Sequence, residues 1–415
     1  MSNQIPNIGP GANLKGLDLR RVKLRGVNLE GAILEKANLR GVILIGSNLR
    51  GANLEGADLT GADLRVTNLR EANLREAILE RTHLEKAHLE RAHLEKAFLG
   101  GAYLEEAHLE GAHLERADLE GTHLEGAHLE GAYLERAHLE GAYLEGAYLE
   151  KANLFGAILQ NAHLEGAYLQ EAYLVKANFQ NAHLEGADLR KVELVSANLI
   201  RANLTGANLE GAYLEGAYLQ EAILERAILE RAHLEGAHLE KANLIRANLI
   251  GADLSGAKLQ EADLERANLS DAILKKAHLE ESYLEEANLE RADLEKAHLE
   301  GATFLFANLR RANLSGANLR GADLYGSNLE EADLRSADFT EANLYSVDLT
   351  EADFTGTILT GVDLTGTILT GVDLEGTRLN NTQRAQIAAS SYFSIQQQSS
   401  NNLASTRSSI FSSYN

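Results

Sequence analysis

Apolar and polar residues alternate on a five-residue period along almost the whole chain. From Leu14 to Leu379, every fifth residue is leucine or, at four places, phenylalanine, and no insertion or deletion interrupts the 74 repeats. We write this position as i. Position i−2 is alanine in 57 repeats and never carries a charge. The remaining positions are polar or variable, and position i+2 holds 33 of the 36 glycines.

This period predicts very short extended segments separated by turns. In an extended segment, residues i−2 and i point to one side and residue i−1 points to the other. An apolar pair every five residues fits neither the 3.6-residue period of a helix nor a long strand. Glycine at i+2 gives the backbone freedom that a turn requires. We therefore expect an all-β chain whose leucine and alanine side chains fill a shared interior.

The repeat resembles the pentapeptide-repeat family, whose consensus is A(N/D)Lxx. Segments 51–60 (GANLEGADLT) and 316–325 (GANLRGADLY) match this consensus residue for residue. The resemblance covers residues 12–381 and implies a right-handed quadrilateral β-helix of about 18 coils, with four repeats in each coil. The period itself does not reveal the number of sides, so this number rests on the resemblance.

The pattern divides the chain into three parts. Residues 1–11 contain both prolines, Pro6 and Pro10, which remove backbone donors, and we expect an N-terminal cap segment there. Residues 12–381 form the expected β-helix. Residues 382–415 form the expected C-terminal part, a short capping helix followed by a tail rich in serine and glutamine.

The C-terminal part contains two candidate features. Thr382 is the expected N-cap of a helix that would close the interior. The tail is either disordered or an association segment that pairs with a second copy or a larger assembly. Its candidate association residues are Tyr392, Phe393, Ile395, Ile410, Phe411 and Tyr414.

Composition excludes several classes of function. The chain has no cysteine, which removes disulfide scaffolds and thiolate chemistry. Its formal net charge is −22, of which −20 falls within residues 80–300, and this charge argues against direct nucleic-acid binding. No leader or membrane-spanning segment is visible, so we expect a cytoplasmic protein that does not bind membranes. No motif indicates a cofactor.

All 14 histidines occupy position i−1, on the outside of the expected coils. With twenty residues in each coil, rings twenty positions apart should stack. His88, His108 and His128 should form one ladder with Tyr148 and Tyr168. An adjacent ladder should contain His83, Tyr103, His123, Tyr143, His163 and His183. Stacked imidazoles point the same way instead of converging, so we expect no metal site.

Glutamate dominates position i+1 beside these ladders, and a solvated acidic face is the simplest explanation. The alternative is an interaction surface, whose candidate residues are His88, His108, His128, Tyr148 and Tyr168 with Glu105, Glu110, Glu115, Glu120, Glu125 and Glu130. No position of the repeat offers a concave catalytic pocket, so we expect no enzyme and no catalytic residues.

These observations predict a non-catalytic structural or interaction protein. A rigid acidic stack of coils would present its side-chain ladders to protein partners, or assemble into a homo-oligomer or larger particle through the C-terminal tail. The resemblance implies an alternative, because some members of the family mimic DNA and bind type II topoisomerases such as gyrase.

Overall fold

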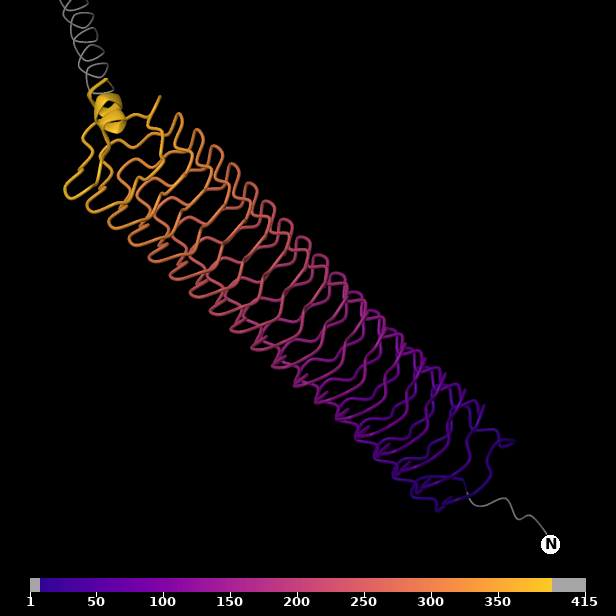
Figure 1. Ribbon diagram of the computed structural model, residues 1–415. Coiled ribbons are helices and arrows are strands. Elements are labelled where there is room, and N and C mark those ends of the chain that lie inside the picture. The colour runs from indigo at the N-terminus through magenta and orange to yellow at the C-terminus, as the bar shows by residue number, and fades with distance from the viewer. Residues whose placement is uncertain (1–7, 390–415) are drawn as a thin grey trace, which may run out of the picture. The chain divides into compact units, whose positions relative to one another are not determined.

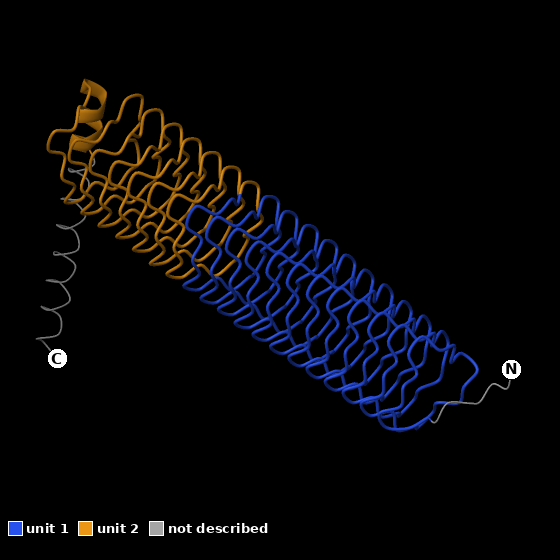
Figure 2. Ribbon diagram, turned by 90° about the horizontal axis from the view of Figure 1, so that it is seen from below, with its two compact units in different colours: residues 1–239 blue, residues 240–415 orange. Residues whose placement is uncertain are grey.

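The computed structural model describes residues 8–389 (Figure 1). It divides into two compact units, residues 1–239 and residues 240–415, which Figure 2 shows in blue and orange. Each unit is a stack of coils, and the same five-residue structure repeats through both. None of the described helices is long and apolar enough to cross a membrane.

Single parallel β-bridges, repeated every twenty residues, connect neighbouring coils. In unit 1, Asn13 pairs with Ile33; in unit 2, Asn243 pairs with Asp263. The Leu14 N–H donates to the Ile33 carbonyl at 2.7 Å, and the Ile33 N–H donates to the Ala12 carbonyl at 2.8 Å. A twenty-residue step contains four five-residue repeats, so every coil has four sides. The fold is therefore the expected quadrilateral β-helix.

The interior of each unit is filled by positions i and i−2. Nearly all leucines and alanines at these positions are almost completely buried, the exceptions lying at the two ends of the chain, such as Leu17 and Leu379. Phe179 in unit 1 and Phe304 in unit 2 occupy leucine positions without exposure. Where threonine replaces alanine at i−2, its hydroxyl finds a backbone partner. Thr122 donates to the Leu99 carbonyl at 3.0 Å, so the polar atom adds a hydrogen bond between coils.

The corners show that glycine is favoured but not required. Gly31 has a φ of 63°, in the left-handed region that suits glycine. Lys36 and Glu106, at the same position of their repeats, have φ of 56° and 54°. Charged residues therefore adopt the same corner conformation, at a cost of about 1 kcal/mol each, and they carry the corner charges.

The first coil begins in a turn. Its Ala12 N–H donates to the Gly9 carbonyl at 3.1 Å, across Pro10. Lys23 has no β-bridge to the next coil, whereas Asn13 and Asp18, the i−1 residues of the two preceding repeats, each have one. Residues 1–7, including Pro6, lie outside the described residues, so the N-terminal cap stays a prediction.

A helix at residues 381–389 covers the last coil of unit 2. Its N-cap is Asn380 rather than Thr382: the Asn380 Oδ1 accepts from the Gln383 N–H at 2.9 Å, and the Gln383 Oε1 accepts from the Asn380 N–H at 3.0 Å. This reciprocal pair is a capping box, which a glutamine at the third helical position completes. The expectation that Thr382 is the N-cap was wrong, because Gln383 pairs reciprocally with Asn380 and so fixes Asn380 as the N-cap.

Candidate interaction surface

Three columns of stacked rings lie on three sides of unit 1. Neighbouring rings in a column are twenty residues apart, with centroids 4.7–5.1 Å apart. The first column is His83, Tyr103, His123, Tyr143, His163 and His183; the second is His88, His108, His128, Tyr148 and Tyr168; the third is His93, His113 and Tyr133.

The first and second columns have the order that the sequence predicts. The third column was missed, although His93, His113 and Tyr133 have the same twenty-residue spacing that identified the others. Shorter stacks also occur: His278 and His298 of unit 2 stack at 4.5 Å, and unit 1 has the pairs Tyr213–His233 and Tyr218–His238, at 4.9 and 5.0 Å. The rings are held by backbone bridges on both sides, so each column is rigidly spaced.

A column of glutamates runs beside each column of rings, because each glutamate follows its ring residue by two positions. His108 Nδ1 lies 3.3 Å from Glu110 Oε1, and the same contact recurs at His113 and Glu115, at 3.2 Å. The first column is flanked by Glu85, Glu105, Glu125, Glu145, Glu165 and Glu185, the second by Glu90, Glu110, Glu130 and Glu150, and the third by Glu95, Glu115 and Glu135.

Five of the six candidate glutamates therefore lie beside rings of the three columns. Glu120 is the exception, because it is on the fourth side of its coil, where its N–H donates to Asp118 at 3.2 Å. The candidate association residues Tyr392, Phe393, Ile395, Ile410, Phe411 and Tyr414 lie outside the described residues, and their role stays a prediction.

Stacked carboxylates affect one another's ionisation. Burial raises the pKa of Glu105, and the carboxylates of Glu125 and Glu85, one coil away on either side, raise it further against the effect of its own backbone N–H. Like charges in adjacent coils repel. The glutamate columns therefore carry negative charge that a cation would stabilise.

Arginine supplies that cation at the N-terminal end of two columns. Burial by itself would raise the pKa of Glu90, but its own backbone N–H and the Arg70 guanidinium lower it overall. The Arg70 side chain reaches Glu90 at 2.6 Å, and Arg75 reaches Glu95 at 2.8 Å. The glutamates that follow in these columns have no such arginine one coil before them.

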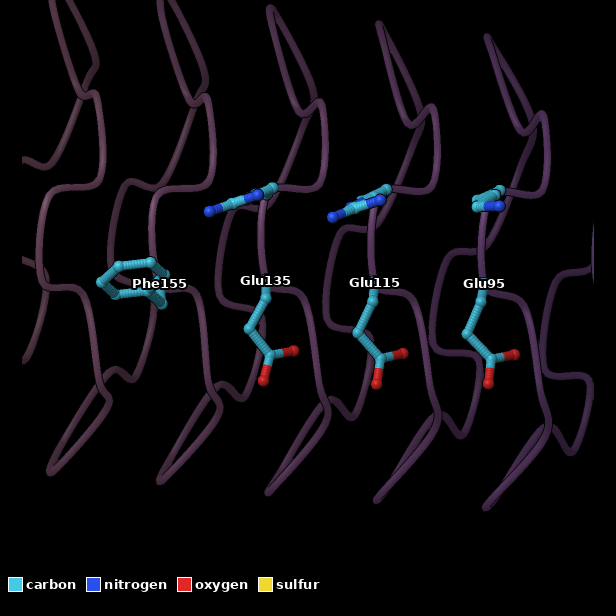
Figure 3. Close-up of a pocket in the computed structure, with 7 residues that line it drawn as sticks. Glu95, Glu115, Glu135 and Phe155 are labelled. Atoms are coloured by element: carbon cyan, nitrogen blue, oxygen red, sulfur yellow. The ribbon is translucent and has the colours of Figure 1, made fainter.

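A shallow groove of about 570 Å³ runs along the third column's side of unit 1. Glu95, Glu115 and Glu135 point the same way on successive coils, and Phe155 takes their place on the next coil (Figure 3). The corner cations Lys96, Arg116 and Arg136 form the other wall. The groove is thus a strip of acidic and basic rows that ends at an aromatic ring.

The four-sided coils, their parallel bridges and their Leu/Ala interior define a right-handed quadrilateral β-helix built from five-residue repeats. The sequence model "Pentapeptide repeats (8 copies)" matches overlapping segments that extend from residue 11 to residue 382, with residues 195–196 unmatched. The chain therefore belongs to the pentapeptide-repeat family.

Several solved structures are similar to this chain. HetL, a pentapeptide repeat protein involved in heterocyst differentiation regulation from the cyanobacterium Nostoc sp. strain PCC 7120, is 33% identical over 58% of this chain and 90% of its own, with a TM-score of 0.23. A pentapeptide repeat protein from the Arabidopsis thaliana thylakoid lumen is 31% identical over 33% and 74%, with a TM-score of 0.17.

Full-length QnrB1, a plasmid-mediated fluoroquinolone resistance protein, is 20% identical over 44% of this chain and 93% of its own, with a TM-score of 0.23. A comparison with curated protein sequences gives no match.

Proposed function

We propose that unit 1 provides a non-catalytic binding surface for a basic segment of a partner protein. The observation that carries this proposal is the run of glutamates beside the second column. Glu110, Glu130 and Glu150 follow one another at one-coil spacing, and the arginine that neutralises Glu90 has no counterpart beside them. A partner that brings lysine or arginine side chains would remove the repulsion within this row.

The neighbouring rings support the same proposal. Tyr148 and Tyr168 extend the second column with stacked phenol rings, and Tyr168 is 39% exposed. Arginine side chains bind both carboxylates and aromatic faces, so a basic segment finds both kinds of contact on one side of the unit. Because the backbone bridges fix the spacing beforehand, binding requires little ordering of this surface.

A charge-neutralising variant tests the proposal. The triple substitution Glu110→Gln, Glu130→Gln and Glu150→Gln keeps side-chain size and removes three charges from the second column's glutamates. The control removes three corner charges from unit 2, with Gln at Glu281, Glu341 and Glu351. Net charge changes equally in both variants, so any difference between them reports position.

The measurement is binding of a fluorescent twelve-residue arginine-rich peptide to the purified full chain, followed by anisotropy in the presence of EDTA. We expect the triple variant to weaken binding at least fivefold and the control to change it less than twofold. Raising salt from about 50 mM to about 200 mM should reduce this difference. Equal losses in the two variants would mean that only total charge matters, and would overturn the proposal.

Two further outcomes separate the partner classes. Inhibition of gyrase supercoiling by the purified protein would identify the alternative, a DNA-mimicking binder of a type II topoisomerase. Assembly is tested by sedimentation velocity with and without residues 390–415. This truncation keeps the helix at residues 381–389. A change in the number of chains per particle would therefore be caused by loss of the tail and not by loss of the cap.

A further inference from the structure

Two arginines reveal what a histidine–glutamate pair on these columns can hold. Arg70 Nη2 lies 2.9 Å from His88 Nδ1 and 2.6 Å from Glu90 Oε1. A guanidinium group has only donors, so both atoms must accept from it. The imidazole lone pair and the carboxylate oxygen therefore point at one position, and a positively charged group occupies it.

The third column repeats this arrangement. Arg75 Nη2 lies 2.8 Å from His93 Nδ1 and 2.8 Å from Glu95 Oε1. Two independent pairs thus bind a cationic nitrogen in the same way. We call each such pair a cation clamp, defined as the Nδ1 of a histidine and the Oε1 of the glutamate two residues later.

One coil further along the second column, the clamp has no arginine. The residue twenty positions before Glu110 is Glu90, whereas the residue twenty positions before Glu90 is Arg70. Among the described residues, the only ion pair of Glu110 is with His108. Its second oxygen, Oε2, is buried without a hydrogen-bond partner, as is that of Glu90. The clamp of His108 and Glu110 therefore faces more negative charge than the clamp that Arg70 fills.

The dimensions of this clamp suit a small metal ion. His108 Nδ1 and Glu110 Oε1 lie 3.3 Å apart. Two ligands of a tetrahedral ion with bonds of about 2.0–2.1 Å are separated by about 3.3–3.4 Å. His128 supplies a third donor, because its ring nitrogen lies within 4.8 Å of the other two ligand atoms.

We propose that His108, Glu110 and His128 bind a zinc ion, with a water molecule as the fourth ligand. Two imidazoles and one carboxylate favour zinc over magnesium or calcium, which prefer all-oxygen sites. Closing the site requires His128 to approach by no more than about 1.5 Å to reach the tetrahedral separation. The rings are about one-third exposed, so a change of side-chain torsion achieves this without moving the backbone bridges.

The expectation of no metal site rested on the imidazoles alone. Parallel rings stacked at 4.9 Å do not converge on one ion by themselves. The glutamate changes this conclusion, because it lies in the same coil as its histidine. Glu110 and His108 together supply the first two ligands before His128 moves. His278, Glu280 and His298 of unit 2 have the same composition and spacing, and provide an independent second example.

Removing ligands tests the site. Zinc bound to the purified full chain is measured by equilibrium dialysis and elemental analysis, and cobalt absorption reports tetrahedral coordination. We expect the double variant His108→Asn, His128→Asn to lose about one tightly bound zinc per chain. Asparagine occupies the same position in many repeats, so the coils should tolerate it. The control His88→Asn alters the clamp that Arg70 occupies and should lose none.

Removing an arginine tests the clamp in the opposite direction. Arg75→Gln frees His93, Glu95 and His113, which have the same three ligand types. We expect this variant to gain about one zinc per chain, with a cobalt spectrum matching that of the unaltered site. Unchanged zinc content in both the double histidine variant and Arg75→Gln would overturn the proposal. So would the absence of zinc binding at micromolar concentrations. Circular dichroism of each variant is the control for folding.

Discussion

The helix at residues 381–389 closes the β-helix through hydrogen bonds from its side chains, and substitutions in it test this role. In most coils, the i−1 N–H donates to the carbonyl that lies 21 residues earlier, as Asp63 does to Val42 at 2.9 Å. After the last coil of unit 2, the equivalent donor would be the backbone N–H of residue 383. That residue is helical, and the Gln383 side chain donates instead, to Val362 at 3.1 Å and to Leu359 at 2.6 Å.

Gln386 completes the replacement. The Leu364 N–H, which would donate to the carbonyl of residue 383 in a continued coil, donates to the Gln386 Oε1 at 3.3 Å. Two side chains of the helix therefore supply the donor and the acceptor of the missing coil. Gln383 is only 2% exposed, so its hydrogen bonds are made away from water.

The substitution Gln383→Glu tests this account with almost no change in shape. It places a carboxylate oxygen against two carbonyl oxygens in a buried site, and we expect unit 2 to lose about 3–5 kcal/mol. Gln383→Met removes the donor without adding charge, and it also removes the Oε1 that accepts from the Asn380 N–H. It leaves the Val362 carbonyl unpaired, because the Leu359 carbonyl retains its bond from the Val362 N–H. This loss should cost about 1–3 kcal/mol.

Hydrogen exchange of peptides from residues 355–380 is the assay, since a repeat array loses stability first in the coils next to the damage. Burial against two carbonyls raises the folded-state pKa of the introduced carboxyl. Its neutral form is therefore favoured in the folded protein, and acidification should recover stability. Thr382→Glu is the control, because it adds the same charge at an exposed position of the same helix. Exchange in Gln383→Glu that matched this control would refute the capping role.

Two further predictions concern unit 2. Gly326 and Gly321 both have left-handed backbones, with φ of 67° and 66°, but an added methyl group would lie 2.7 Å from the Phe306 ring only at Gly326. Gly326→Ala should therefore destabilise more than Gly321→Ala in thermal unfolding, and Phe306→Ala should remove the difference; equal effects would contradict the clash. The hydrogen bond from Arg335 holds the pKa of Asp333 below its usual value, so its contribution is present above about pH 4 and is lost on further acidification. Asp333→Asn should flatten this part of the stability–pH curve, and an unchanged curve would exclude the ion pair as its source.

The five-residue period was enough to predict which side chains are inside. This follows from strand geometry and a constant phase, so Leu134 is placed without any tertiary information. The stacking of His108 on His128 also required a coil of twenty residues. The number of sides came only from the resemblance. The roles of Gln383 and Gln386 depend on which backbone groups the last coil leaves unpaired, and that requires the register between coils.

The corner residues show a second limit of the pattern. Glycine at i+2 indicated a turn, but a lysine or glutamate there gave no sign that it shares the glycine conformation. Neighbouring coils impose this conformation, because the i+2 N–H must donate to the coil that follows, as Lys36 does to Glu55 at 2.9 Å. Tertiary hydrogen bonding thus overrides a local backbone preference of about 1 kcal/mol.

The same register determines what the outer surface can bind. A residue at i+1 lies next to the residues twenty positions before and after it, so the meaning of one glutamate depends on its neighbours in the column. Arg70 before Glu90 closes a clamp internally, whereas Glu90 before Glu110 leaves the next clamp without an internal cation. The two clamps have the same composition, because each consists of one histidine and one glutamate. The proposed zinc site and basic-segment surface therefore follow from the order of charges along each column, and shifting one arginine by twenty residues should relocate them.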